Sequence, residues 1–285
     1  MSAHKLIKFT QSLYSKPHLI NQVAFNAVST YLTQRNLMNP NQLVSEGENE
    51  EDETPDDLDD FDPEMGIGVI NVEGALSYKP IYGLCGEVGM SYVSLLEKAE
   101  EMIETGCKTL VLNVDSGGGE GYSCMETANE LRKMCDDNGV YLIAYNDGTI
   151  ASAAYAISCA ADEVISNPSA DTGSIGVLIA LMNDSKALEQ DGYVRSFIYA
   201  GAKKIPYEAD GSWKESFLEE LQTKVDTLYG EFVAHVNKYT GIDTKIIRGF
   251  EAGMFSAPEA LENGLINKIM TRSEFVSYLV DRMDK

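Results

Sequence analysis

Histidine is scarce in this chain of 285 residues, which contains only His4, His18 and His235. None of them lies near a serine that could occupy a sharp catalytic turn. A Ser-His-Asp triad needs a histidine as its general base. The scarcity of histidine therefore counts against a triad and favours a serine activated by another base.

Cysteine is also sparse, and its spacing is uninformative. The chain has five cysteines, an odd number without any CxxC pair: Cys85, Cys107, Cys124, Cys135 and Cys159. A disulfide framework or a zinc site would require paired or clustered spacing. We therefore expect reduced, mostly buried thiols, and no metal or organic cofactor.

Basic residues are outnumbered, with 22 Lys and Arg against 45 Asp and Glu and a formal net charge of −23. A chain this acidic repels nucleic-acid phosphates, so direct DNA or RNA binding is not expected. No apolar run approaches the roughly 18–20 residues that span a bilayer. Residues 1–13 also lack the apolar core of a signal peptide. We expect a soluble cytoplasmic protein without a membrane segment.

The pattern along the chain divides it into three parts. Residues 1–43 have apolar positions at helical spacing and predict one or two amphipathic helices, either docked on the main body or used to bind partners. Residues 44–64 include twelve carboxylates and no Lys or Arg from position 46 onward, which predicts a disordered acidic linker. Residues 65–285 hold the main domain.

Strands and helices alternate within residues 65–285, which predicts an α/β fold with a parallel or mixed sheet. The expected strands and helices are as follows: strands at 66–72, 109–114, 140–145, 163–166, 175–181 and 194–199, and helices at 88–105, 122–135, 152–160 and 213–239, followed by two or three short helices.

Two residues in this domain could form a catalytic pair without histidine. Ser152 lies among small residues in the sequence IASAAY (150–155), where the backbone can turn sharply before a helix. Lys204 follows the apolar run 197–199, and a lysine whose charged form is disfavoured by burial can take the proton of a serine hydroxyl. Neighbouring Lys203 leaves the choice of lysine open at this point, and a plain N-cap serine remains the simpler interpretation of Ser152.

Glycine-rich turns supply candidate partners for this pair. Gly118 and Gly119 follow a predicted strand, where their N–H groups could cradle a phosphate or form an oxyanion hole; Glu120 directly after them favours the oxyanion hole. The N–H of Ala153 is a natural second oxyanion donor. In the sequence DTGSIGV (171–177), Ser174 could orient the lysine amine, although this segment could also be only a turn.

Together these motifs resemble the signal peptide peptidase A family of serine proteases, and more closely its tailed-bacteriophage branch, the prohead (head maturation) proteases. The family sequence Ser/Thr-Pro-Gly-Gly is matched by residues 116–119, with Gly117 in place of proline. The serine motif is matched by 151–155, and the Thr-Gly-Ser-Ile-Gly-Val motif by 172–177. The lysine motif Gly-x-x-Lys is matched by 201–204, which selects Lys204. The C-terminal motif is matched by 255–266, with Asn267 where an aspartate is usual.

The resemblance covers about residues 66–270. It implies a crotonase/Clp-protease-like fold with repeating ββα units, a Ser152–Lys204 dyad and hydrolysis of peptide bonds. It also implies a homo-oligomer, in which neighbouring subunits can complete each site. The implied substrates are scaffold and capsid proteins inside the viral procapsid, in the host cytoplasm.

Two other functions remain open on the sequence. One is a cytosolic, signal-peptide-peptidase-like protease that degrades peptide remnants or misfolded chains. The other is a catalytically inactive, crotonase-like assembly factor. The acyl-CoA chemistry of crotonases is less favoured, because the sequence suggests no basic pocket for the CoA phosphates.

Overall fold

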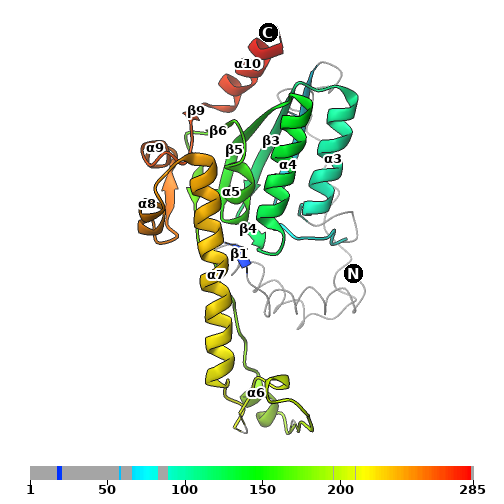
Figure 1. The fold of residues 1–285 in the computed structure, drawn as a ribbon, viewed down its shortest axis with the longest axis vertical. Coiled ribbons are helices and arrows are strands. Elements are labelled where there is room, and N and C mark those ends of the chain that lie inside the picture. The colour runs from blue at the N-terminus through cyan, green and yellow to red at the C-terminus, as the bar shows by residue number, and fades with distance from the viewer. Residues whose placement is uncertain are drawn as a thin grey trace.

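The sheet at the centre of the molecule is mainly parallel, and helices pack against it (Figure 1). The computed structural model describes residues 18–20, 58, 66–82, 89–194, 196–208 and 210–283. In spatial order, the main strands are β2 (Ile67–Glu73), β3 (Thr109–Ser116), β5 (Tyr141–Ala151), β6 (Glu163–Ser166) and β9 (Lys268–Ile269). The predicted α/β class is confirmed.

The central strands are apolar on both faces because side chains alternate along a strand. In β3, Leu110 and Leu112 contribute to the main core, whereas Val111 between them contributes to a second, smaller core. Residues Leu142 and Ile143 of β5 divide between the two cores in the same way. A continuous apolar run in the sequence thus becomes a strand buried from two sides.

Several helices contribute to the main core, among them α3 (Tyr92–Thr105), α4 (Cys124–Asn138), α5 (Ala153–Ser158) and the C-terminal part of α7 (Glu215–Thr240). Helix α3 starts at Ser91, whose side chain accepts the Ser94 N–H, and ends at Gly106 in the left-handed conformation. Helix α10 (Arg272–Met283) covers the second core on the opposite face of the sheet.

Shorter strands extend the sheet around the end of β5. Strand β7 (Asp171–Gly173) pairs in parallel with β5 and antiparallel with β8 (Met254–Ser256), which lies between α8 (Thr244–Gly249) and α9 (Ala257–Glu262). A separate two-stranded sheet joins β1 (His18–Ile20) to β4 (Gly118–Glu120) in antiparallel orientation. These short elements meet where β3 and β5 end, beside the candidate residues Ser152 and Gly118.

An arm projects from the body, formed by residues 181–214 and the N-terminal half of α7 (Figure 1). It contains α6 (Ser185–Gln190) and a 3₁₀ turn at Ala202–Lys204. Its own packing is mainly aromatic, with the ring centroid of Trp213 4.7 Å from that of Tyr207 and 5.5 Å from that of Phe217. The arm therefore has a small apolar cluster of its own, away from both cores of the body.

Most of the predicted elements from β2 to α7 are present, but two predicted strands are wrong. Residues 175–181 form only an isolated bridge at Leu178, and the described residues of 194–199 form no strand. Residues 175–181 pair with β1 only at Leu178, too briefly to form a strand, and the described residues of 194–199 lie on the arm, away from the sheet. The short strands β4, β7, β8 and β9 were not predicted.

The structure describes little of the two N-terminal segments. Within residues 1–43, only His18–Ile20 is described, and it is a strand where helices were predicted. Within the predicted linker 44–64, only Leu58 is described, and it is buried in the second core, unlike a residue of a solvated linker. The remaining predictions for residues 1–64 lie outside the described residues.

Two further predictions concern the state of the cysteines and the presence of a membrane-spanning helix. Cys107, Cys124, Cys135 and Cys159 are buried and form no disulfide, as predicted, while Cys85 lies outside the described residues. No described helix is both long enough and apolar enough to cross a bilayer.

The second core depends on the stacking of Phe275 in α10 against Tyr145 in β5, with ring centroids 4.2 Å apart. Phe275 is fully buried, so Phe275→Ala leaves a cavity and should lower the free energy of unfolding by about 3 kcal/mol or more. Urea denaturation measures this. The control is Val280→Ala on the same helix, where the side chain is 48% exposed and the change should stay within about 0.5 kcal/mol. Equal effects of the two substitutions would contradict this account of the second core.

Candidate active site

Ser152 occupies the single-residue turn between β5 and α5. Its backbone has φ 58° and ψ −115°, a conformation that non-glycine residues rarely adopt and that costs roughly 1–3 kcal/mol. A strained serine between a strand and a helix is the geometry of a nucleophile elbow, although this sequence lacks the Gly-x-Ser-x-Gly motif. The small neighbours Ala151 and Ala153 are both fully buried, which explains why this stretch contains only small side chains.

Strand β7 holds this turn in place. The Ser152 N–H donates to the Gly173 carbonyl at 2.9 Å, and Ala151 pairs with Gly173 in the sheet. The side chain of buried Asn146 in β5 donates to the Asp171 carbonyl and to Thr172 Oγ1, both at 3.0 Å. The DTG part of the predicted motif therefore has a defined structural role, since it fixes the backbone around Ser152.

The Ser152 hydroxyl has only a weak partner. Its Oγ lies 3.5 Å from the Gly176 carbonyl oxygen, longer than an ordinary hydroxyl hydrogen bond. Ser174, predicted to orient a lysine, is mostly buried at φ 55° and lies directly after β7. Its N–H donates to the Gly253 carbonyl at 2.8 Å, which ties this turn to the chain entering β8. Ser152 and Ser174 thus lie close together, because the Ser152 N–H bonds to Gly173, the residue directly before Ser174.

The predicted oxyanion donors lie beside this turn. As the first residue of α5, Ala153 has an N–H that no carbonyl of the same helix can accept. A methyl group placed on Gly118 would lie 3.0 Å from this nitrogen and 3.0 Å from the Ala151 carbonyl oxygen, so only glycine allows β4 to approach so closely. The Gly118 N–H itself donates to Ser116 Oγ at 3.1 Å.

Gly119 is enclosed on two sides. A methyl group there would lie 1.9 Å from the Leu76 carbonyl oxygen, and Leu76 also bonds to both neighbours of Gly119 in β4. The opposite edge of β4 pairs with β1, so that Gly119 stands across from Leu19. The glycines therefore serve close backbone packing, and the carboxylate of Glu120 accepts the Tyr78 N–H at 3.1 Å.

Two residues near the site carried no clear signal in the sequence. His235 of α7 bonds through Nε2 to the Ala156 carbonyl of α5 at 2.8 Å, and so braces the helix that begins after Ser152. Cys124 Sγ lies 3.5 Å from the Ala153 carbonyl oxygen. Burial raises the pKa of this thiol to about 12, which keeps it protonated and unsuited to act as a nucleophile. Only the positions of α4 and α7 relative to α5 in the fold reveal these two contacts.

Lys204 lies elsewhere, in the exposed 3₁₀ turn of the arm. Its neighbour Lys203 is ion-paired with Glu220 near the start of α7 at 2.9 Å, whereas α5 contacts α7 at His235. Glu220 and His235 are 15 residues apart on one helix, which corresponds to about 22 Å along its axis. A lysine side chain cannot span this separation. One chain therefore brings together Ser152, Ala153, Ser174 and the two glycines, and leaves Lys204 apart.

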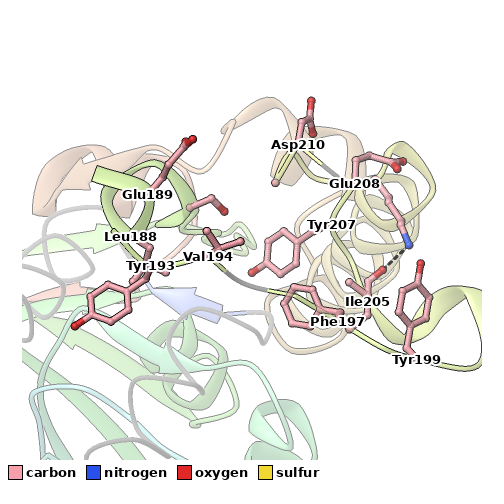
Figure 2. Close-up of a pocket in the computed structure, with 13 residues that line it drawn as sticks. Leu188, Glu189, Tyr193, Val194, Phe197, Tyr199, Ile205, Tyr207, Glu208 and Asp210 are labelled. Atoms are coloured by element: carbon pink, nitrogen blue, oxygen red, sulfur yellow. Dashed lines mark hydrogen bonds between the residues drawn. The ribbon is translucent and has the colours of Figure 1, made fainter. Parts of the chain in front are cut away.

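The arm also contains a pocket, which none of the residues of the serine site line. It has a volume of about 590 Å³ and lies between α6 and the segment around Tyr207 (Figure 2). The amine of Lys214 donates to the Ile205 carbonyl at 2.8 Å along one side of it. Among the described residues, no group of three or more His, Cys, Asp or Glu side chains could hold a metal ion.

Comparison with known proteins identifies the family of the chain. Residues 136–284, which include Ser152 and Lys204, match the family described as peptidase family S49. This match covers more than half of the chain, and the chain belongs to peptidase family S49, as the resemblance in its motifs predicted.

Three curated relatives are similar to this chain. Capsid assembly protease C of Escherichia phage lambda is 27% identical and covers 82% of this chain and 53% of the relative. Head-tail preconnector protein GP5 of Enterobacteria phage P21 is 25% identical, covering 77% and 44%. The putative signal peptide peptidase SppA of Enterococcus faecium is 31% identical, covering 63% and 52%. The chain thus spans about half the length of these relatives.

A solved structure of a ClpP1 variant from Listeria monocytogenes is also similar to this chain. It covers 73% of this chain and 93% of its own, with a TM-score of 0.43 at 12% identity.

The contact of His235 with α5 predicts a pH dependence of stability. Burial lowers the pKa of His235 below the ordinary value of 6.5, so the unfolded chain takes up a proton at a higher pH than the folded chain. The free energy of unfolding should therefore fall as the pH falls through about 6.5. Urea denaturation at a series of pH values between about 7.5 and 5.5 measures this fall.

The control is His235→Gln, which keeps an N–H donor but cannot titrate in this range. The other two histidines of the sequence are present in both proteins and cancel in the comparison. The variant should lose less stability than the parent over the same pH interval. An identical pH dependence in both proteins would remove His235 as its cause.

Proposed function

We propose that this chain is a serine endopeptidase in which Ser152 is the nucleophile and Lys204 the general base. The observation that carries the proposal is the strained turn at Ser152, which places a weakly bonded hydroxyl between the last residue of a strand and the free N–H at the start of α5. Strain of this kind persists where the surrounding structure enforces it and is concentrated at functional sites.

The reaction would follow the usual course of serine acyl transfer. The Ser152 hydroxyl oxygen attacks the carbonyl carbon of the scissile bond while its proton passes to the neutral amine of Lys204. The ammonium then returns the proton to the leaving amine, which gives an acyl-enzyme. Water, deprotonated by the same lysine, releases the acyl group and restores the serine. No metal or organic cofactor takes part in these steps.

The oxyanion of each tetrahedral intermediate would be stabilised by backbone N–H groups. Ala153 is the principal donor in this proposal because its N–H has no helical acceptor. The N–H of Gly119 or Gly118 would be the second donor, although Gly118 would first have to give up its bond to Ser116 Oγ. Ser174 would orient the incoming amine from the side of β7.

The lysine would come from a neighbouring subunit. In one chain Lys204 lies on the arm, on the order of 20 Å along α7 from the level of α5. The arm also exposes a cluster of large apolar side chains, among them Val194, with 87% of its surface accessible, and the fully exposed Ile198. Apolar side chains clustered on a projecting element are typical of a protein interface. We therefore propose a homo-oligomer in which the arm of one subunit brings Lys204 to Ser152 of the next.

Similarity to two phage proteins supports scaffold and capsid proteins as substrates, cleaved during prohead maturation inside the host cell. The alternative is a degradative peptidase, which similarity to a putative signal peptide peptidase supports. Incubation with purified scaffold and capsid proteins distinguishes the two. A few defined cleavages favour maturation, and general degradation of unfolded proteins favours the alternative. An inactive assembly factor would not react at Ser152 with a fluorophosphonate probe.

Complementation between two inactive variants tests the proposed dyad. Ser152→Ala and Lys204→Ala should each lower peptide hydrolysis by about 10⁴-fold or more, because each removes one half of the pair. Chains carrying the two substitutions are co-expressed with different tags and purified through both. Random mixing in a ring gives roughly a quarter of the sites an intact serine and an intact lysine, so about this fraction of activity should return.

Matched controls exist for both positions. Lys203→Ala removes the adjacent lysine, whose amine is ion-paired with Glu220, and should keep its activity. Ser158→Ala removes a buried hydroxyl of α5 that lacks a hydrogen-bond partner and should also remain active. If wild-type protein hydrolyses peptides and the mixed oligomer does not, the dyad does not form across subunits.

The exposed face of the arm predicts a second outcome. Ile198→Asp places a charge in the proposed subunit contact, and should reduce both the mass of the assembly in analytical ultracentrifugation and the rate of peptide hydrolysis. Val280→Asp, at a side chain that is 48% exposed on α10, is the control and should alter neither quantity. An unchanged assembly with Ile198→Asp would show that this face does not join subunits.

A further inference from the structure

Strand β1 is a three-residue peptide held by backbone contacts on both of its edges. On one edge it runs antiparallel to β4, with Leu19 opposite Gly119 and Ile20 opposite Gly118. On the other edge, the His18 N–H donates to the Leu178 carbonyl at 2.8 Å, and the Leu178 N–H donates to the His18 carbonyl at 3.0 Å. Residues 18–20 therefore fill a slot between two backbone segments that come from distant parts of the sequence.

This slot lies directly beside Ser152. A methyl group placed on Gly118 would lie 2.2 Å from the Leu19 carbonyl oxygen and 3.0 Å from the nitrogen of Ala153. The carbonyl of Leu19 is thus a close neighbour of the N–H assigned above to the oxyanion hole. Leu178 follows the DTGSIGV motif that holds the Ser152 turn. Both walls of the slot belong to segments that build the serine site.

The manner in which β1 is bound resembles the binding of an extended peptide. Main-chain hydrogen bonds to a strand edge hold a peptide of any sequence, while pockets for alternate side chains select its residues. Here the Leu19 side chain is fully buried and belongs to the main core, and the flanking residues are each only 5% exposed. The slot therefore accepts an extended backbone with a large apolar side chain at the position of Leu19.

We propose that the slot between β4 and Leu178 is the peptide-binding groove of the serine site, and that residues 18–20 occupy it as an internal, substrate-like strand that inhibits the enzyme. The proposal rests on the function assigned to Ser152 and extends it in two respects. It selects substrates with a branched apolar residue at the position of Leu19. It also requires the chain's own strand to leave the groove before a substrate can bind.

A strand supplied by the same chain competes strongly with a free peptide. A tethered segment acts at an effective concentration in the millimolar range, without any loss from dilution. The apparent affinity for a substrate is then its intrinsic affinity multiplied by the fraction of molecules in which the groove is empty. Weakening of the internal strand should therefore strengthen the binding of a peptide added from solution.

Peptide binding tests the groove without relying on catalysis. A fluorescent peptide with the sequence of residues 15–23 is titrated into the full-length Ser152→Ala protein with and without Leu19→Asp, and its anisotropy is recorded. Aspartate at this buried position disfavours the bound strand. The peptide should bind the Leu19→Asp protein at least about tenfold more tightly. Equal affinities, or no binding to either protein, would overturn the proposal.

Four controls keep this result specific. The same peptide carrying Leu19→Asp should not bind. Leu261→Asp in the protein, at a side chain that is 43% exposed on α9, should leave peptide binding unchanged. Thermal unfolding verifies that the Leu19→Asp protein is folded, and Leu19→Gly, which removes the apolar side chain without adding a charge, should produce the same gain in affinity.

Labelling of Ser152 separates this inference from the proposed function. In proteins that retain Ser152, a fluorophosphonate probe should label the Leu19→Asp variant faster than the parent. Tighter peptide binding without labelling of either protein would retain the groove and reject Ser152 as the nucleophile. Labelling of both proteins at one rate, with equal peptide affinities, would retain the nucleophile and reject inhibition by residues 18–20.

Discussion

The bond from the Ser152 N–H to the Gly173 carbonyl, at 2.9 Å, is the constraint on which the site depends. It holds a non-glycine residue at positive φ, a conformation that would relax without support at a gain of roughly 1–3 kcal/mol. The support continues outward through the pairing of β7 with β5 and through the bonds of buried Asn146 to the backbone and side chain of β7. The hydrogen bonds of β5 and β7 thus hold the strained backbone of Ser152 in place.

The molecule separates the parts of its proposed chemistry. The body holds the serine, the backbone donors and the groove, whereas the arm carries the lysine on an exposed turn. An isolated subunit of this form would lack the base that activates its nucleophile, and its groove would contain its own residues 18–20. Under the proposed function, both features keep the subunit inactive until it is assembled and its internal strand is displaced. If the substrates are structural proteins, as proposed, a delay of activity until assembly prevents their premature cleavage.

Much of the body could be predicted from the sequence because local patterns determine it. Short segments rich in apolar residues marked β2, β3 and β5, and helical spacing marked α3, α4 and α7. Predictions failed where partners are decided by tertiary contacts. The segment 194–199 ends in an apolar run, but its described residues lie on the arm and pair with no described strand. Residues 18–20 are a strand only because β4 and Leu178 provide edges on either side. The bracing contact of His235 with α5 depends on how α7 crosses the body.

By itself, the sequence determined the α/β class, membership in peptidase family S49 and the serine at the head of a helix. These follow from the periodicity of side chains and from small residues at a turn that tolerates nothing larger. Only the tertiary structure decided that Ser152 and Lys204 stand apart in one chain, and that residues 18–20 lie beside the serine. The distance from Ser152 to Lys204 depends on the length and direction of α7, and the position of residues 18–20 depends on which strand edges are open. Local sequence patterns do not encode the direction of a helix or the openness of a strand edge.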